Sequence, residues 1–142
     1  MKILQACVLL SLGGLLAACA GGPKLSESNV PSIPQDQGRI YFYRTQVIGV
    51  AVQPSIRLNG NKVGDCQPNG VFFKDVAPGD YEATVTTEVE HKLTFTIAKS
   101  EEKYVRCYIT FGLFVGHAVL ELVDPEEARG KIAGLSLTAG AP

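Results

Sequence analysis

Hydrophobic and polar residues alternate along most of the chain between residues 38 and 124. A period of two is typical of β-strands that bury one face and expose the other. β-branched and aromatic residues, which are common in strands, dominate the alternating segments. The clearest of these segments are residues 40–43, 56–58, 81–88, 92–97 and 104–111.

Turn signals separate these segments. Asn59-Gly60 favours a tight hairpin because both residues tolerate positive φ. Pro78-Gly79 favours a turn in which proline presets φ and glycine takes the left-handed position. Short strands without long helical patterns between them predict an all-β fold. We expect a small antiparallel β-sandwich of about seven strands over residues 38–134, with a small barrel as the alternative.

One short helix is predicted near the C-terminus. Asp124 is a favourable N-cap, and Pro125 suits the first helical position. The two glutamates that follow favour the positive end of the helix dipole. Ala128 and Ile132 share one face and are expected to pack on the sheet. The small residues that dominate 135–142 predict a disordered tail.

The N-terminus has the pattern of an export signal. Lys2 is the one charged residue among residues 1–18, and an apolar stretch runs from Ile3 to Leu16. This stretch is shorter than the roughly 20 residues that a membrane-spanning helix needs. Small residues follow it, as a signal peptidase requires, so residues 1–18 are expected to be a signal peptide.

The end of this segment, Leu16-Ala17-Ala18-Cys19, resembles the lipobox of bacterial lipoproteins at every position. The resemblance implies cleavage before Cys19 and attachment of diacylglycerol to its thiol. Two or more acyl chains anchor a protein stably, since each buried CH₂ contributes about 0.8 kcal/mol. Ala20, where enteric bacteria use aspartate for retention at the inner membrane, implies the outer membrane. The alternatives are an ordinary secretory signal that precedes a cysteine by chance and a retained transmembrane helix.

Residues 19–37 are predicted to form a flexible tether between the lipid and the domain. Pro23, Pro31 and Pro34 favour extended backbone, and few large apolar residues accompany them. The alternative is a proline-rich motif that binds a partner.

The segment Val71–Tyr81 places a Pro-Gly turn between the end of one strand and a tyrosine that begins the next. It resembles PEGA-like and carboxypeptidase-regulatory-like modules, which are small prealbumin-like β-sandwiches. Together with Gly38–Arg44, Asn59-Gly60, Tyr104–Arg106 and Leu120–Val123, it makes residues 38–132 similar to a family of bacterial envelope lipoproteins known only as a domain of unknown function. The resemblance implies a fold and a location in the envelope, but no activity.

Two cysteines, Cys66 and Cys107, lie in the expected domain, whereas Cys7 leaves with the signal. Export to an oxidising compartment favours a disulfide between them. In the chain-entropy description, a disulfide that closes the loop between Cys66 and Cys107 would stabilise the domain by about 4 kcal/mol. The alternatives are two buried, unpaired cysteines and a reactive thiol or metal site.

The remaining chemistry indicates no enzyme. The 13 basic and 14 acidic residues give a net charge of −1, which does not favour nucleic acid as a partner. His91 and His117 have no nucleophile or orienting carboxylate near them in a recognisable pattern. Neither cysteine has neighbours at metal-ligand spacing, and the glycines lie at turns rather than in a phosphate-binding loop. We therefore predict no catalytic residue, no metal site and no cofactor.

An apolar loop is the first candidate for a binding surface. The stretch Phe111–Leu120 carries no charge and is punctuated by glycines. Its centre, Leu113, Phe114 and Val115, is predicted to contact a partner protein or the bilayer surface. The alternative is a hairpin turn folded over the open end of the sandwich.

Four tyrosines are the second candidate. They lie on strand faces opposite the predicted core, and on adjacent strands they would form an aromatic surface suited to a sugar or a peptide. The alternative is a second sheet face that other elements partly cover. The residues are Tyr41, Tyr43, Tyr104 and Tyr108.

These observations lead to one functional expectation. The protein is expected to be a lipid-anchored, periplasm-facing envelope lipoprotein, and the outer membrane is favoured over the inner membrane. It is expected to act as a non-enzymatic structural or protein-interaction module with an envelope protein as partner. The alternatives are a carbohydrate- or peptidoglycan-binding module, and a hydrolase or hydrolase inhibitor.

Overall fold

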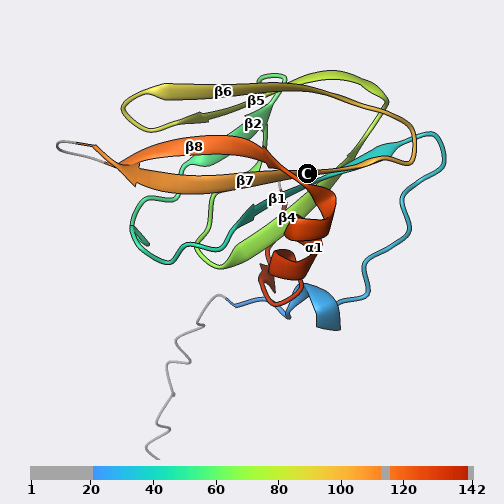
Figure 1. The fold of residues 1–142 in the computed structure, drawn as a ribbon, viewed down its shortest axis with the longest axis horizontal. Helices are drawn as coiled ribbons and strands as arrows, with labels where there is room; N and C mark the ends of the chain where they lie inside the picture. Colours follow the sequence, from blue (N-terminus) through green and yellow to red (C-terminus); the bar gives the residue numbers. More distant parts are fainter. Residues whose placement is uncertain (1–20, 113–115, 141–142) are drawn as a thin grey trace, which may run out of the picture.

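Two β-sheets pack face to face in a computed structural model that describes residues 21–112 and 116–140 (Figure 1). The first sheet has the order β8-β7-β1-β4-β9 and the second the order β3-β2-β5-β6. The strands of the first sheet are β1 (Gly38–Arg44), β4 (Gly70–Val76), β7 (Glu102–Phe111), β8 (Gly116–Val123) and β9 (Ser136–Leu137). Those of the second are β2 (Ser55–Leu58), β3 (Asn61–Asp65), β5 (Gly79–Thr86) and β6 (Glu90–Ile97). An α-helix, α1 (Pro125–Ile132), and a short 3₁₀ helix, η1 (Leu25–Glu27), complete the described elements.

This architecture confirms the predicted all-β sandwich with one short C-terminal helix. It differs in two details, because residues 21–112 and 116–140 form nine strands and two of the pairings between them are parallel. Strand β7 lies parallel to β1, and β9 lies parallel to β4. After β4 the chain forms β5 and β6 of the second sheet, and β7 then pairs with β1 in the first sheet. The alternation of residue types is the same in both pairing directions, so it could not distinguish them.

The main core lies between the sheets and follows the predicted alternation. Ile40 and Phe42 on β1 are fully buried, as are Val105 and Cys107 on β7. The rings of Phe42 and Phe72 stack with centroids 5.1 Å apart.

The two predicted turns, Asn59-Gly60 and Pro78-Gly79, make different kinds of connection. Asn59 and Gly60 have φ values of 47° and 84°, so the predicted hairpin between β2 and β3 is confirmed. The Pro78-Gly79 turn, in contrast, joins β4 in the first sheet to β5 in the second. It is therefore a corner between the two layers and not a hairpin.

Helix α1 covers the outer face of the first sheet. The Asp124 carboxylate accepts a hydrogen bond from the backbone N–H of Glu126 at 2.9 Å, which confirms the predicted cap. Ala128 and Ile132 are buried against the sheet, as predicted. They form a second apolar cluster with Leu135 and with residues of β1, β4 and β7. Within the described ranges, no helix is long and apolar enough to cross a membrane.

The N-terminal segment packs against the domain, which corrects the prediction of a flexible tether for residues 21–37. Leu25 donates its backbone N–H to the carbonyl of Leu135 at 2.9 Å. The buried Arg39 guanidinium donates to the carbonyl of Pro31 at 2.8 Å while it pairs with Asp75 at 2.6 Å. These contacts use main-chain carbonyls and N–H groups, which composition does not reveal.

The C-terminal residues are also ordered, so the predicted tail over 135–142 is corrected for residues 135–140. Leu135 is buried, and Ser136–Leu137 forms β9 on the edge of the first sheet. Small polar residues left no apolar pattern here, yet their backbone groups pair with the exposed edge of β4.

The disulfide between Cys66 and Cys107 is confirmed, with their Cα atoms 6.1 Å apart. Cys66 follows β3 in the second sheet, and Cys107 lies on β7 in the first. The bond therefore joins the two layers of the sandwich.

Candidate functional site

The two ends of the sandwich differ in charge. At the end where β1 finishes, the β1–β2 connection (45–54) and the β3–β4 connection (66–69) contain no Asp, Glu, Lys or Arg, and the β5–β6 connection (87–89) contains one charged residue, Glu88. We call this the uncharged end. The opposite end, where β1 begins, is called the charged end. Charged residues gather on its strand ends and connections: Lys74, Asp75, Asp80, Glu82, Lys99 and Glu101.

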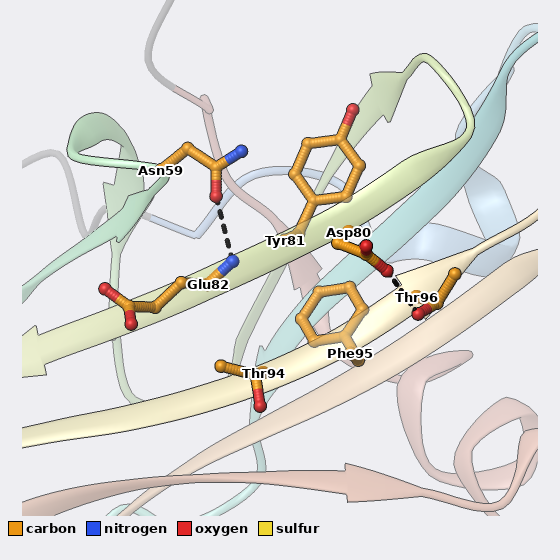
Figure 2. Close-up of a pocket in the computed structure, with 7 residues that line it drawn as sticks. All are labelled: Asn59, Asp80, Tyr81, Glu82, Thr94, Phe95 and Thr96. Carbon is orange, nitrogen blue, oxygen red and sulfur yellow. Dashed lines mark hydrogen bonds between the residues drawn. The ribbon is translucent and has the colours of Figure 1, made fainter.

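A shallow depression of about 510 Å³ lies at the charged end (Figure 2). We call it the β5–β6 groove, since most of its residues come from these two strands. Tyr81 and Phe95 face each other across the pair, with ring centroids 6.4 Å apart. The lining residues are Asn59, Asp80, Tyr81, Glu82, Thr94, Phe95 and Thr96.

Hydrogen bonds hold the groove in shape. The Asn59 side chain accepts from the backbone N–H of Glu82 at 2.9 Å, which ties the β2–β3 turn to β5. The Thr96 hydroxyl donates to Asp80 at 2.6 Å, as the dashed line in Figure 2 shows. The Tyr81 hydroxyl donates to the carbonyl of Ala77 at 2.7 Å. The groove thus places carboxylate, amide and hydroxyl groups beside the half-buried Tyr81 ring, while the Phe95 ring is buried in the main core. This set fits polar ligands with a small apolar face.

Sequence reasoning did not predict this groove. The strand alternation places Tyr81 and Phe95 on the core face, and this is where they lie: Phe95 is buried in the main core and Tyr81 packs against it. The pairing register places them opposite one another at the end of the second sheet. The signal that could have located the groove is a strand-to-strand register, which one sequence does not display.

A buried arginine organises the uncharged end. The Arg44 side chain is 1% exposed, and burial lowers the pKa of its guanidinium. It donates hydrogen bonds of 2.7–3.1 Å to five backbone carbonyls. The accepting residues are Gln46, Ile48, Gly49, Val52 and Cys66. Arg44 therefore shapes the β1–β2 connection from the inside.

Gln46 fixes the same connection to β7. Its side-chain amide donates to the carbonyl of Ile109 at 3.1 Å and accepts from the N–H of Ile109 at 2.8 Å. Four apolar side chains project from this braced region and are 57–79% exposed. We call them the apolar rim: Val47, Ile48, Val50 and Phe111.

The predicted loop Leu113, Phe114 and Val115 follows Phe111 after one glycine but lies outside the described residues. The lipobox residues Leu16, Ala17, Ala18 and Cys19 also lie outside them.

The tyrosine face requires a correction. Tyr41, Tyr43 and Tyr104 are 2–7% exposed, because α1 and the segment around Leu25 cover them. Tyr108 is half-buried, with the Arg106 guanidinium 5.0 Å from its ring centre. The four residues therefore do not form an open aromatic surface. The periodicity correctly placed them on the second face of the sheet but did not reveal the helix above it.

Tyr104 is the polar centre of this covered face. Its hydroxyl donates to Glu102 at 2.9 Å and accepts from Arg129 at 3.1 Å, and Arg129 pairs with Glu102 at 2.8 Å. Burial, reinforced by the hydrogen bond to Glu102, raises the pKa of Tyr104 to about 12. The cluster connects α1 to β7.

Alkaline pH is expected to weaken the packing of α1 through Tyr104. A tyrosine in the unfolded chain has a pKa near 10, so the higher folded pKa stabilises the protein fully below pH 10. This contribution, on the order of 2 kcal/mol, should be lost as the pH rises from 10 to about 12. Urea unfolding across this range should show the loss in the natural protein and a smaller loss in Tyr104→Phe. The matched variant Tyr108→Phe should behave like the natural protein, and equal losses in all three would contradict the assignment.

The two histidines come together, which their sequence positions did not indicate. His91 on β6 and His117 on β8 line a depression of about 310 Å³ between the sheet edges. The Nδ1 atom of His91 accepts from the backbone N–H of Leu120 at 3.2 Å. His91 therefore satisfies a donor on the free edge of β8, which is a structural role.

The fold and these surfaces define the class as a two-layer β-sandwich with a helix-covered outer face. The chain belongs to the family described as "Protein of unknown function (DUF2846)", whose model matches residues 34–118. A protein of Haemophilus influenzae, named only as an uncharacterized protein, is 30% identical over 130 residues, which cover 87% of this chain and 77% of that protein. No solved structure matches the chain.

Proposed function

We propose that the protein is a lipid-anchored lipoprotein on the periplasmic side of the envelope, in the outer membrane. It acts without catalysis, as a structural or protein-interaction module. The observation that carries this proposal is the lipobox pattern Leu16-Ala17-Ala18-Cys19, and the start of the described chain supports an anchor that lies close to the domain. A Cβ at Gly22 would collide with the carbonyl of Leu137, so the backbone lies tightly against β9 only three residues after Cys19. A lipid on Cys19 would therefore hold the folded domain directly at the membrane.

The β5–β6 groove is the proposed partner surface. It lies at the charged end, away from the β4–β9 edge where the chain begins. Its carboxylates and rings favour a partner that presents basic or hydroxyl groups beside apolar surface.

A second candidate function is binding of carbohydrate or peptidoglycan. The lining of the groove supports it, because the half-buried Tyr81 ring can meet the apolar face of a sugar while Asp80, Glu82 and Asn59 meet its hydroxyls. The tyrosine face that first suggested this function is covered, so the groove takes its place.

The anchor is tested by lipid analysis of the protein purified from its own envelope. Mass spectrometry should find Cys19 at the N-terminus with acyl chains attached, and Cys19→Ser should release the domain from the membrane fraction. Cys19→Ser leaves the described domain intact, so loss of membrane association would report the anchor alone. An unmodified cysteine, or an uncleaved signal, would contradict the proposal.

The partner surface is tested by photo-cross-linking in cells. A photoreactive phenylalanine replaces Thr94, which is exposed in the groove, or Thr86, which is exposed on β5 near the uncharged end. A protein adduct at position 94 and not at position 86 is expected. A peptidoglycan adduct at position 94 would favour the second candidate, and no adduct would remove the groove from the proposal. The predicted contact of Leu113, Phe114 and Val115 with a partner is tested in the same cross-linking experiment by changing all three residues to Ser.

A further inference from the structure

The apolar rim is a fixed group of exposed hydrophobic side chains. Phe111 is 79% exposed, and Val47, Ile48 and Val50 are each 57–60% exposed. Isolated exposed aliphatic residues are common, but a group of them on one end of a small domain indicates a contact surface. Val47, Ile48 and Val50 belong to the connection that Arg44 and Gln46 brace, so the backbone that carries them is held in place.

The charge pattern around the rim favours an apolar environment. The connections 45–54 and 66–69 contain no charged residue, and neither does the stretch from Phe111 to Gly112. The charged residues at the surface of this end lie on the second sheet: Asp65 at the end of β3, which pairs with Lys62, and Glu88 between β5 and β6. The surface that these uncharged connections form can leave water without stranding an ion, whereas the charged end cannot.

The start of the described chain lies at the same end. Gly22 contacts Leu137, and the neighbouring Ser136 pairs with Gly70 at the beginning of β4. Gly70 in turn pairs with Arg44, the last residue of β1, from which the rim connection departs. Cys19 precedes Gly21 by two residues, a span of about 7 Å in extended chain.

We propose that the apolar rim docks on the lipid bilayer and inserts its side chains below the headgroups. This inference rests on the proposed lipidation of Cys19, because the acyl chains bring the uncharged end to the membrane surface. The rim then adds a second contact beside the anchor, and two contacts orient the domain where one leaves it free to rotate. Figure 1 shows the β1–β2 connection and the tip of β7 on the same side of the molecule.

Tryptophan fluorescence tests the docking directly, because the natural chain contains no tryptophan. Phe111→Trp places a reporter in the rim, and Tyr81→Trp places the matched reporter in the groove at the charged end. Each full-length lipidated protein is reconstituted into phosphatidylethanolamine–phosphatidylglycerol vesicles with brominated acyl chains. We expect bromine to quench the reporter at position 111 roughly twofold or more and to leave that at position 81 nearly unchanged.

A second variant keeps the test independent of the reporter. Changing Val47, Ile48 and Val50 to Ser in the Phe111→Trp protein should reduce the quenching, while the thermal unfolding temperature stays close to that of the parent because these side chains are exposed. Equal quenching at positions 81 and 111, or none at 111, with acylated Cys19 would overturn the docking and leave the proposed function intact. Absence of lipid on Cys19 would overturn both.

Discussion

Replacing Arg44 by methionine is expected to lower the free energy of unfolding by several kcal/mol, because each buried carbonyl left without a donor costs about 1–3 kcal/mol. Methionine retains most of the side-chain volume but donates no hydrogen bond. The carbonyls that the guanidinium now satisfies would face a buried apolar group and lose their donors. Urea unfolding followed by circular dichroism measures the change.

The matched control for this substitution is Arg57→Met. Arg57 is exposed on β2 and donates one hydrogen bond, to the carbonyl of Gly60 at 3.2 Å. Its replacement should alter stability by less than about 1 kcal/mol. If Arg44→Met and Arg57→Met have similar effects, Arg44 does not organise the connection. Arg44→Lys should also be strongly destabilising, since one ammonium group cannot replace the planar fork.

Removing the disulfide by changing Cys66 and Cys107 together to Ala is expected to destabilise the domain by about 4 kcal/mol. The bond closes a sequence separation of 41 and joins the two sheets, so its loss frees the unfolded chain. The natural protein in reducing buffer should unfold at nearly the same urea concentration as the double variant. A difference of less than about 1 kcal/mol between oxidised and reduced protein would contradict this role.

The two effects should also be coupled. Arg44 donates to the carbonyl of Cys66 at 3.1 Å, so the guanidinium and the disulfide hold the same turn. Removing both should cost less than the sum of the separate losses, by about 0.5–3 kcal/mol. Strict additivity would show that the turn keeps its position when either brace is lost. The coupling matters for function because the same turn lies at the uncharged end.

Features that depend on residues close together in the chain could be predicted from the sequence. The alternation of residues such as Ile40 and Phe42 with Tyr41 and Tyr43 correctly divided each strand into two faces. The Asn59-Gly60 hairpin and the Asp124 cap were also predicted, since each depends on conformational preferences within a few residues. The disulfide followed from two thiols in an expected oxidising compartment, and the structure selected it from the alternatives.

The candidate site depended on long-range contacts instead. Arg44 ends a predicted strand, and nothing nearby in the sequence indicates that it is buried among carbonyls. The β5–β6 groove requires the register that sets Tyr81 opposite Phe95. The apolar rim requires Gln46 to bring the β1–β2 connection beside β7.

The sequence by itself therefore determined the strand pattern, the Asn59-Gly60 hairpin and the helix cap, because each is encoded by neighbouring residues. The tertiary structure decided that α1 covers the tyrosines and that residues 21–37 pack against the domain. It also decided that the two ends of the sandwich differ in charge and exposure. The physical reason is that these features depend on pairings between main-chain groups far apart in the chain, which side-chain patterns do not record.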